Sequence, residues 1–353
     1  MTAFDIATAR LHAQRLVRPL KTPAAVVEHL LAVQSQDYGG AAWALAQRAK
    51  GTTAATVDAA FTEGTILRTH VMRPTWHFVA PADARWLLEL TGPRVQQQNQ
   101  YGYKQVGLTA AKLAKTDMLL ADELRGGQHL TRDELAKRLP GKLAMTHVMM
   151  HAELERVVIS GPRRGKQFTY ALFDERVPKD PVPFLSRDHA LAHLAERYVT
   201  GHGPAQVEDL AWWSGLTTKD ARRGLEAAGL RVHEVGSCRY YMAPLRASAL
   251  PVPTVHLLPN YDECLVAFAD RSDARDPRVK DMKVSVLSGH FVLSNGKLIG
   301  GWRRGHATKK ALVIHATLLA KPTREELDAM NAAAAKLGRF LGTTTRLEIA
   351  SSL

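Results

Sequence analysis

Gln34 and Gln36, two glutamines one residue apart, are the side chains in this sequence best suited to act together on one small group. A carboxamide accepts hydrogen bonds through its oxygen and donates two through its nitrogen. A pair in one cleft can therefore orient a water molecule and hold a sugar, phosphate or base. A buried amide without partners costs roughly 1–3 kcal/mol, so a hydrophobic core does not favour such a pair. The alternative is that both amides cap a helix end or reach solvent.

The pattern around the glutamines predicts an apolar helix over residues 22–34. Thr22 and Pro23 suit its N-cap and first position, and Gly39-Gly40 is expected to stop it. On a continuing helix, residues two apart point about 200° from each other and could not act on one molecule. We therefore expect Gln34 in the last helical turn and Gln36 just past it, in extended backbone.

Length and composition predict a multidomain globular protein with a polyanionic partner. The chain has 353 residues, of which 46% are hydrophobic, enough for two or three domains of about 100–200 residues. Lys and Arg exceed Asp and Glu by 13, which favours nucleic acid over an anionic membrane. The sequence shows no signal peptide or membrane span, and it has only two cysteines. We expect a cytoplasmic, nucleoid-associated protein without a membrane partner.

One order of elements, three helices followed by a β-hairpin, is predicted three times. The first unit spans residues 1–105, with helices over 22–34, 40–50 and 56–63, strands over 66–71 and 75–79, and a polar connecting helix over 82–105. The second unit spans 106–177. Its first and third helices are predicted over 110–124 and 145–155, and its second helix begins at a capping box formed by residues 131–134. Its strands, 157–159 and 168–172, flank a basic turn at 161–166, as in a DNA-contacting wing.

A proline-spaced linker at 177–183 precedes the third unit, 184–244. Its predicted helices are 188–199, 207–214 and 217–228, and its strands are 230–234 and 239–242. The last domain, 254–353, is predicted to be mostly β with one packed helix, 323–340. Its strands are expected over 255–258, 265–268, 291–293, 297–303, 311–319 and 345–349. The fold class is therefore α+β, with three tandem winged-helix units and a C-terminal β domain.

Several segments resemble the AlkZ-type winged-helix DNA glycosylases, and the resemblance covers essentially the whole chain. The segments are 31–37, 68–78, 257–263 and 301–304. The resemblance implies a C-shaped clamp on DNA and excision of N7-alkylated guanine, including guanine in interstrand crosslinks. The catalytic motif of that family is Gln, an aliphatic residue, then Gln or Asp, which falls on Gln34, Ser35 and Gln36. Ser35 departs from the aliphatic middle position.

The chemistry of such a substrate explains why amides would suffice. Alkylation at N7 makes the base cationic, so it leaves as a neutral molecule without a general acid, while the sugar gains oxocarbenium character. Only a water needs placing, and Gln34 and Gln36 can place it. We expect a monofunctional DNA glycosylase that acts as a monomer on double-stranded DNA with alkylated or crosslinked guanine. It needs no cofactor and no metal, since neither the leaving group nor the water requires a Lewis acid.

Further candidates are cleft residues and DNA-binding cations. Arg73, Trp76 and His77 could line the cleft, although alternating hairpin residues usually divide between core and solvent. The turn and strand cations are candidates for phosphate contact, against the alternative of an ordinary solvated turn. They are Arg163, Arg164, Lys166, Arg303, Arg304, Lys309 and Lys310. Asp262 and Glu263 are expected to have a structural hydrogen-bonding role.

A non-enzymatic winged-helix protein, such as a transcription regulator, is the alternative function. A regulator usually needs a dimer and one recognition helix for each half-site. Three unequal units in one chain suit a clamp around one lesion better. An RNA-binding module is disfavoured because aromatic residues make up only 7% of the chain.

Overall fold

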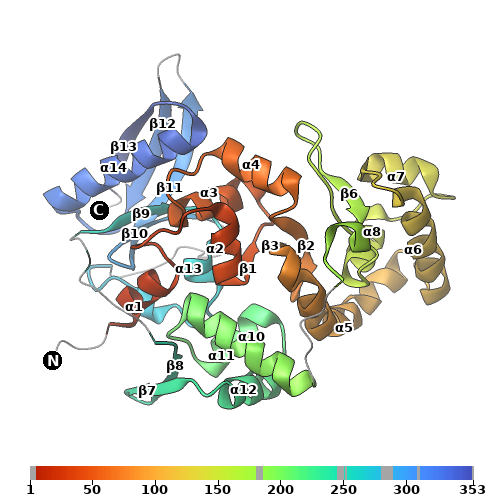
Figure 1. Cartoon of the computed structure of the whole chain (residues 1–353). Helices are drawn as coiled ribbons and strands as arrows, with labels where there is room; N and C mark the ends of the chain where they lie inside the picture. Colours follow the sequence, from red (N-terminus) through yellow and green to blue (C-terminus); the bar gives the residue numbers. More distant parts are fainter. Residues whose placement is uncertain are drawn as a thin grey trace.

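The computed structural model has a mixed α+β fold, with the first helix–hairpin unit at its centre (Figure 1). It describes residues 5–179, 186–244, 250, 253–279, 289–307 and 311–351. The C-terminal sheet lies at the upper left of this unit, the third unit below it and the second unit at its right. Among the described residues, no helix is both long enough and apolar enough to cross a membrane.

The first unit (residues 23–79) adds a strand that the sequence pattern did not predict. Its elements are α2 (Pro23–Leu30), β1 (Ala32–Gln34), α3 (Tyr38–Arg48), α4 (Ala54–Glu63), β2 (Leu67–Val71) and β3 (Arg73–Val79). The strands form an antiparallel sheet in the order β1-β3-β2. A buried face with Val33 and Phe78 packs on the helices, so the sheet holds the segment that carries the glutamines.

The predicted helix over 22–34 is wrong in its second half. Thr22 caps α2 as expected, but the helix ends at Leu30, because Leu31 adopts a left-handed conformation (φ 67°) and β1 follows. Gly39-Gly40 is not a stop signal either, since both glycines lie in the first turn of α3, which Asp37 caps. Pairing of β1 with β3 overrides the local helical preference.

The second unit (residues 110–172) repeats the order of the first. Its elements are α6 (Ala110–Leu124), β4 (Leu130–Thr131), α7 (Arg132–Arg138), α8 (Met145–Leu154), β5 (Val158–Ser160) and β6 (Thr169–Leu172). Its sheet has the corresponding order β4-β6-β5. The predicted capping box of α7 is confirmed, since Thr131 and Glu134 bond reciprocally. The 25-residue helix α5 (Pro81–Gln105) leads into this unit, and α9 (Phe173–Arg176) follows it.

The third unit (residues 187–242) has the same order with a reduced sheet. Its elements are α10 (Arg187–His202), α11 (Val207–Ser214), α12 (Thr218–Ala227), β7 (Arg231–Val235) and β8 (Cys238–Met242). A single bridge between Ala205 and Tyr241 stands where the first strand stands in the other two units. The described residues therefore repeat one topology three times. Most of the predicted linker, residues 180–183, lies outside them.

The described residues of the C-terminal sheet, which lie between 255 and 351, form five strands in the order β13-β12-β11-β10-β9, with β12 and β13 parallel. Its elements are β9 (Val255–Leu258), α13 (Glu263–Val266), η1 (Ser272–Ala274), β10 (His290–Ser294), β11 (Lys297–Ala307), β12 (Leu312–Leu318), α14 (Arg324–Leu341) and β13 (Thr345–Ser351). The predicted strand over 265–268 is wrong. Asp262 accepts from the backbone N–H of Cys264 and starts the short helix α13 there. The N-terminal helix α1 (Ile6–Ala13) packs near this region.

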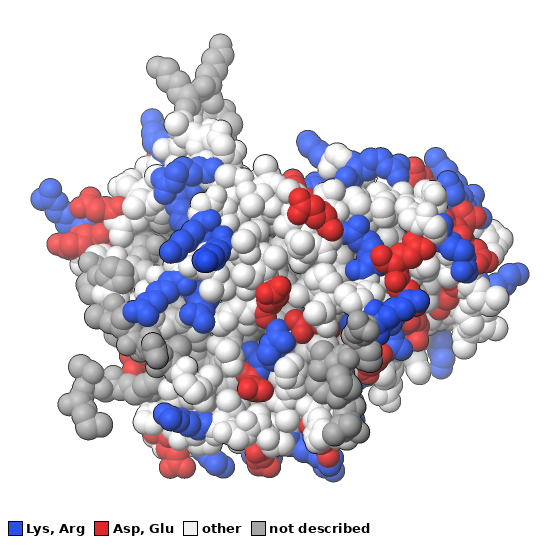
Figure 2. Space-filling model, viewed as in Figure 1, with Lys and Arg blue, Asp and Glu red and all other residues white. Residues whose placement is uncertain are grey.

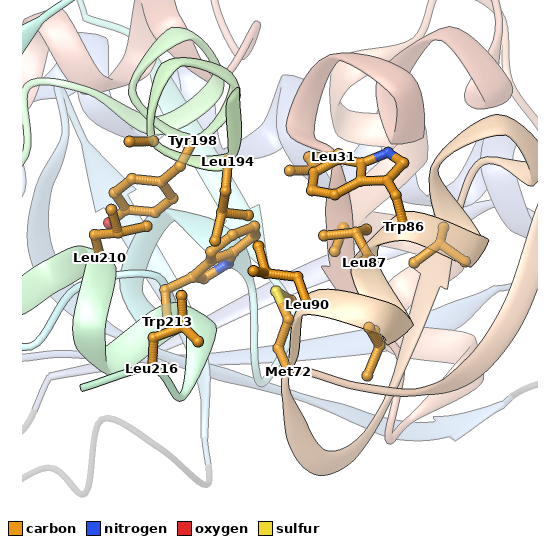
Figure 3. Packing of buried hydrophobic residues seen from close by; sticks show 14 of the residues in the cluster. Leu31, Met72, Trp86, Leu87, Leu90, Leu194, Tyr198, Leu210, Trp213 and Leu216 are labelled. Atoms are coloured by element: carbon orange, nitrogen blue, oxygen red, sulfur yellow. The ribbon is translucent and has the colours of Figure 1, made fainter. Parts of the chain in front are cut away.

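Two hydrophobic clusters fasten the first unit to its neighbours. One joins its helices to β9–β12 and α14. The other joins β2, β3 and α5 to α10 and α11 of the third unit. Figure 3 shows Trp213 of α11 in this second cluster, with Tyr198 and Leu210 on one side and Leu90 and Met72 on the other. The first unit is thus held from both sides.

Two fully buried histidines predict an acid-sensitive fold. Burial lowers the pKa of His77 and of His256 to about 3. The unfolded chain takes up these protons below about pH 6.5, whereas the folded chain does not until near pH 3. Stability should therefore fall as the pH drops below about 6.5, by up to about 1.4 kcal/mol per pH unit for each histidine. Urea midpoints at pH 7.5 and pH 5 measure this difference, and equal midpoints would contradict it. His256→Leu should reduce the difference.

Candidate active site

Gln34 is the last residue of β1, and Gln36 lies in the bend between β1 and α3. Gln34 pairs with His77 in the register of β1 and β3, and the backbone N–H of Ser35 donates to the carbonyl oxygen of Trp76 at 2.7 Å. Both amide oxygens accept hydrogen bonds from residues of β3, Gln34 from Arg73 and Gln36 from Trp76. Strand pairing, and not a helix end, therefore positions the two glutamines, and their action on one small molecule stays a prediction.

Gln34 is held at both its backbone and its side chain. It is only 7% exposed. Its backbone N–H donates to Glu263 Oε1 at 2.7 Å, and its side-chain Oε1 accepts from Arg73 Nη2 at 3.1 Å. The guanidinium fixes which end of the amide is oxygen, so the NH₂ group points away from Arg73. Gln34 is thus a preorganised amide.

Gln36 is the accessible member of the pair. It is exposed, and its Oε1 accepts from the backbone N–H of Trp76 at a long 3.4 Å. A carbonyl oxygen has a second lone pair, which remains available to water. Next to it, Asp37 accepts from the backbone N–H of Gly40 at 3.1 Å. A Cβ on Gly40 would lie 2.9 Å from the side-chain oxygens of both Asn260 and Asp37, so the start of α3 lies close to Asn260.

The predicted cleft residues Arg73, Trp76 and His77 lie on β3 beside the glutamines. Burial lowers the pKa of Arg73, and the Glu263 carboxylate opposes this shift. His77 is fully buried, with Nδ1 2.9 Å from the carbonyl oxygen of Thr75. Its pKa of about 3 keeps it neutral, and burial followed by the charge of Arg73 is the cause. His77 is therefore no proton donor at neutral pH.

The Trp76 side chain belongs to a packed layer. The His70 ring lies 4.4 Å from it, and the Arg68 guanidinium lies 4.4 Å from its ring centroid. Arg68 also donates through Nη2 to the carbonyl oxygen of Ser35 at 3.0 Å. This layer braces the backbone of the residue between the two glutamines.

Two of the three predicted cations in the turn of the second unit form ion pairs. Arg163 Nη1 donates to Asp58 Oδ1 at 2.7 Å and lies over the Tyr38 ring, so it joins the second unit to the first. Arg164 Nη1 donates to Glu134 Oε1 at 2.7 Å. Lys166 is exposed and lines a cavity of about 250 Å³ together with Arg68 and Trp76. Of the three, Lys166 is the best placed to meet a phosphate.

The predicted cations of the C-terminal sheet lie on β11 and in the segment that follows it. Arg303 and Arg304 are exposed on β11, while Lys309 and Lys310 lie outside the described residues. Arg304 lines a cavity of about 220 Å³ between the start of α3 and the Trp302 side chain. Figure 2 shows Lys and Arg side chains following one another over the C-terminal sheet at the upper left, whereas basic and acidic side chains alternate over the second unit.

Glu263 is the site residue that sequence reasoning missed. The expected structural role of Asp262 and Glu263 agrees with their burial, but Glu263 also touches Gln34 directly. Glu263 lies 229 residues from Gln34 along the chain, so no local sequence pattern indicated this contact. The available signal was a pair of carboxylates directly after a buried strand, where unpaired charge is costly.

The assembled groups can orient a neutral nucleophile and stabilise charge. Gln34 and Gln36 offer amide oxygens and NH₂ groups beside β3, and Arg73 holds Gln34 in a fixed orientation. Fixed dipoles of this kind stabilise charge that develops in a transition state without reorganising. The arrangement suits a reaction in which water attacks a carbon that becomes positively charged.

Comparisons with known proteins point to one family. Residues 27–340 match the family model described as DNA glycosylase AlkZ-like. A curated protein of Streptomyces sahachiroi, named interstrand DNA cross-link repair glycosylase, is 23% identical over 317 residues, covering 82% of this chain and 84% of that protein. The solved structure of the DNA glycosylase AlkZ from the same organism has a TM-score of 0.77 at 22% identity and covers 98% of both chains.

Proposed function

The chain belongs to the AlkZ-like DNA glycosylase family, and from this premise we propose that it hydrolyses the N-glycosidic bond of N7-alkylated guanine in duplex DNA. The proposal includes guanine tied into interstrand crosslinks, which is the repair named for the Streptomyces relative. The observation that carries it is the pair of carboxamides that both bond to β3, with Gln34 oriented by Arg73 and Gln36 accessible.

The proposed reaction begins with departure of the cationic base. The C1′–N9 bond breaks, the electron pair goes to the base, and the alkylguanine leaves as a neutral molecule. Gln36 Oε1 accepts a hydrogen bond from the attacking water and holds it opposite the leaving group. The oxygen end of the Gln34 dipole, which has a second lone pair beyond the one that Arg73 uses, faces the developing oxocarbenium ion. Water, and not an amine, attacks C1′ and then loses a proton to solvent, so the product is an intact abasic site and the enzyme is monofunctional.

The charge of Arg73 opposes this cationic transition state unless an anion lies nearby. Burial lowers the pKa of Arg73, and the Glu263 carboxylate acts against this shift, so Glu263 offsets part of the positive charge beside the site. Arg73 can then orient Gln34 at a smaller electrostatic cost to the developing cation.

The proposal extends to the architecture. The three repeated units are winged-helix modules, and with the C-terminal domain they form a C-shaped clamp around the DNA. The predicted boundaries, 1–105, 106–177, 184–244 and 254–353, are the domains of this clamp. The protein acts as a monomer at the nucleoid. Support comes from the recurring helix–strand–helix–helix–hairpin order and the strongly basic composition.

A direct test incubates the purified protein with a duplex carrying one N7-methylguanine and measures abasic sites by alkaline strand cleavage. We expect cleavage at the lesion only, and none in the same duplex with unmodified guanine. A duplex with an N7-guanine interstrand crosslink tests the wider substrate class. If no alkylated duplex yields an abasic site, a DNA-binding regulator becomes the better interpretation.

Binding to undamaged duplex should weaken steeply as salt rises. Each phosphate neutralised by Lys or Arg releases counterions and contributes about −0.9 to the slope of log K against log salt. Fluorescence anisotropy between 50 and 300 mM salt would measure this slope, and a flat response would contradict the prediction. Lys166→Ala should remove one phosphate contact and so make the slope less steep by about 0.9. Arg163→Ala is the less informative variant, because Arg163 already pairs with Asp58.

A further inference from the structure

Glu263 contacts the backbone of the segment that carries the two glutamines. Its side chain is fully buried. Oε1 accepts from the backbone N–H of Gln34 at 2.7 Å, and Oε2 accepts from Trp213 Nε1 at 2.9 Å. The two oxygens of one carboxylate thus hold two donors from distant parts of the chain.

These donors come from different units. Gln34 ends β1 of the first unit, and Trp213 belongs to α11 of the third. His202 of α10 adds a third group, with Nε2 3.4 Å from Glu263 Oε2. Figure 3 shows Trp213 within the packed cluster between the two units, so its indole has little freedom to move. The position of the Glu263 carboxylate therefore depends on how the third unit packs against the first.

Glu263 is held in its ionised form. Burial would raise its pKa, but His202 and the backbone N–H of Gln34 outweigh burial and bring the pKa below its ordinary value. Hydrogen bonds to an ionised acceptor are shorter and about twice as strong as neutral ones. The segment around it is also fixed, since Gln14 Nε2 donates to the Glu263 carbonyl oxygen at 3.0 Å.

We propose that Glu263 is a positioning residue for base excision. It fixes the position of the Gln34 backbone, and because it also binds Trp213, that position depends on how the third unit packs against the first. The proposal rests on the proposed function. Glu263 does not touch the substrate; it fixes the strand end from which Gln34 meets Arg73 and from which Gln36 extends. A displacement of about 1 Å in a catalytic group can cost about 10²-fold in rate, so a partial loss of this anchor has a measurable effect.

Glu263→Gln tests the proposal because it keeps the shape and removes one acceptor. The amide oxygen can serve Gln34 or Trp213, and the NH₂ group then faces the other donor. We expect the single-turnover excision rate at saturating enzyme to fall about 10-fold, with little change in Kd for duplex DNA. Amide hydrogen exchange of residues 31–37 should become faster in the variant.

Glu326→Gln is a matched control for the loss of a buried carboxylate. Glu326 of α14 is also buried, and its Oε1 accepts from Ser294 Oγ of β10 at 2.7 Å in the C-terminal domain. This variant should lower the melting temperature to a similar extent while keeping the excision rate. A rate loss of equal size in both variants would overturn the positioning role.

Trp213→Phe supplies a rescue. In the double variant Glu263→Gln with Trp213→Phe, the amide no longer faces the indole N–H, so its oxygen can return to Gln34. We expect the double variant to recover both the excision rate and the protection of residues 31–37 relative to Glu263→Gln alone. Unchanged exchange in Glu263→Gln, or a wild-type excision rate, would refute the proposal. The exchange measurement tests the contact between Glu263 and the Gln34 backbone even if the wild-type protein excises no base. A failure of the positioning role can therefore be distinguished from a failure of the proposed glycosylase function.

Discussion

Gln36→Ala should slow base release by about 10²–10³-fold, the scale seen when one preorganised polar group is removed from an active site. Gln36 is exposed, and among the described residues its oxygen makes one long hydrogen bond, so its loss removes the acceptor for water without disturbing the fold. Binding of the duplex should barely change, because the basic surface stays intact. Single-turnover kinetics at saturating enzyme separate the two effects.

Two further variants sharpen this experiment. Gln36→Glu keeps an acceptor oxygen at the same position and should retain much more activity than the alanine variant. Gln98→Ala removes an exposed glutamine from α5 and should leave excision unchanged. Wild-type single-turnover excision by Gln36→Ala would show that the paired glutamines are not the catalytic groups, and Arg73, His77 and Asp37 would be examined next.

Asp262→Ala should lower the free energy of unfolding by about 3–5 kcal/mol, because it leaves a buried arginine unpaired. Arg48 donates to both Asp262 oxygens, at 2.9 and 2.7 Å, and the two side chains are 1% and 0% exposed. Burial would lower the pKa of Arg48, but Asp262 raises it above its ordinary value, so the guanidinium stays charged. Folded proteins have only about 5–15 kcal/mol of stability to lose. Urea denaturation measures the change.

The same experiment needs an exposed ion pair for comparison. Asp122 pairs with Arg125, and these side chains are 70% and 69% exposed, so Asp122→Ala should cost less than about 1 kcal/mol. Combining Asp262→Ala with Arg48→Met should restore part of the lost stability, since the uncompensated charge is then gone. Equal losses in Asp262→Ala and Asp122→Ala would show that the buried pair is not important for stability.

Local signals predicted those elements whose boundaries depend on nearby residues. The helices at Ala110–Leu124 and Val207–Ser214 and the strand at Val255–Leu258 have their expected bounds. Each has caps, stops or a buried run that neighbouring residues determine. Local signals failed where a distant segment decides the outcome. Pairing with Phe78 and Val79 turns residues 32–34 into a strand, although their apolar run also fits a helix.

The candidate site divides in the same way. The glutamine pair stays a prediction from residue type, spacing and the family resemblance, and the predicted neighbours Arg73 and Trp76 lie beside it. The Glu263 contact was not predictable, because it joins residues 229 positions apart and the sequence gives no distance between them. The ion pair of Arg163 with Asp58 was missed for the same reason. All the cations of this turn were therefore predicted to bind DNA, although one of them pairs with a carboxylate of the first unit.

The long span between Gln34 and Glu263 has a consequence for biosynthesis. A ribosome produces the glutamines early and the carboxylate that anchors them late, after all three repeated units have been made. A nascent chain can fold its first unit as soon as that unit emerges, yet the strand end with Gln34 then lacks its acceptor. Products of interrupted translation that end before Glu263 would therefore keep basic surface while lacking the finished site. The contact between Gln34 and Glu263 can therefore form only after about three quarters of the chain has been synthesised.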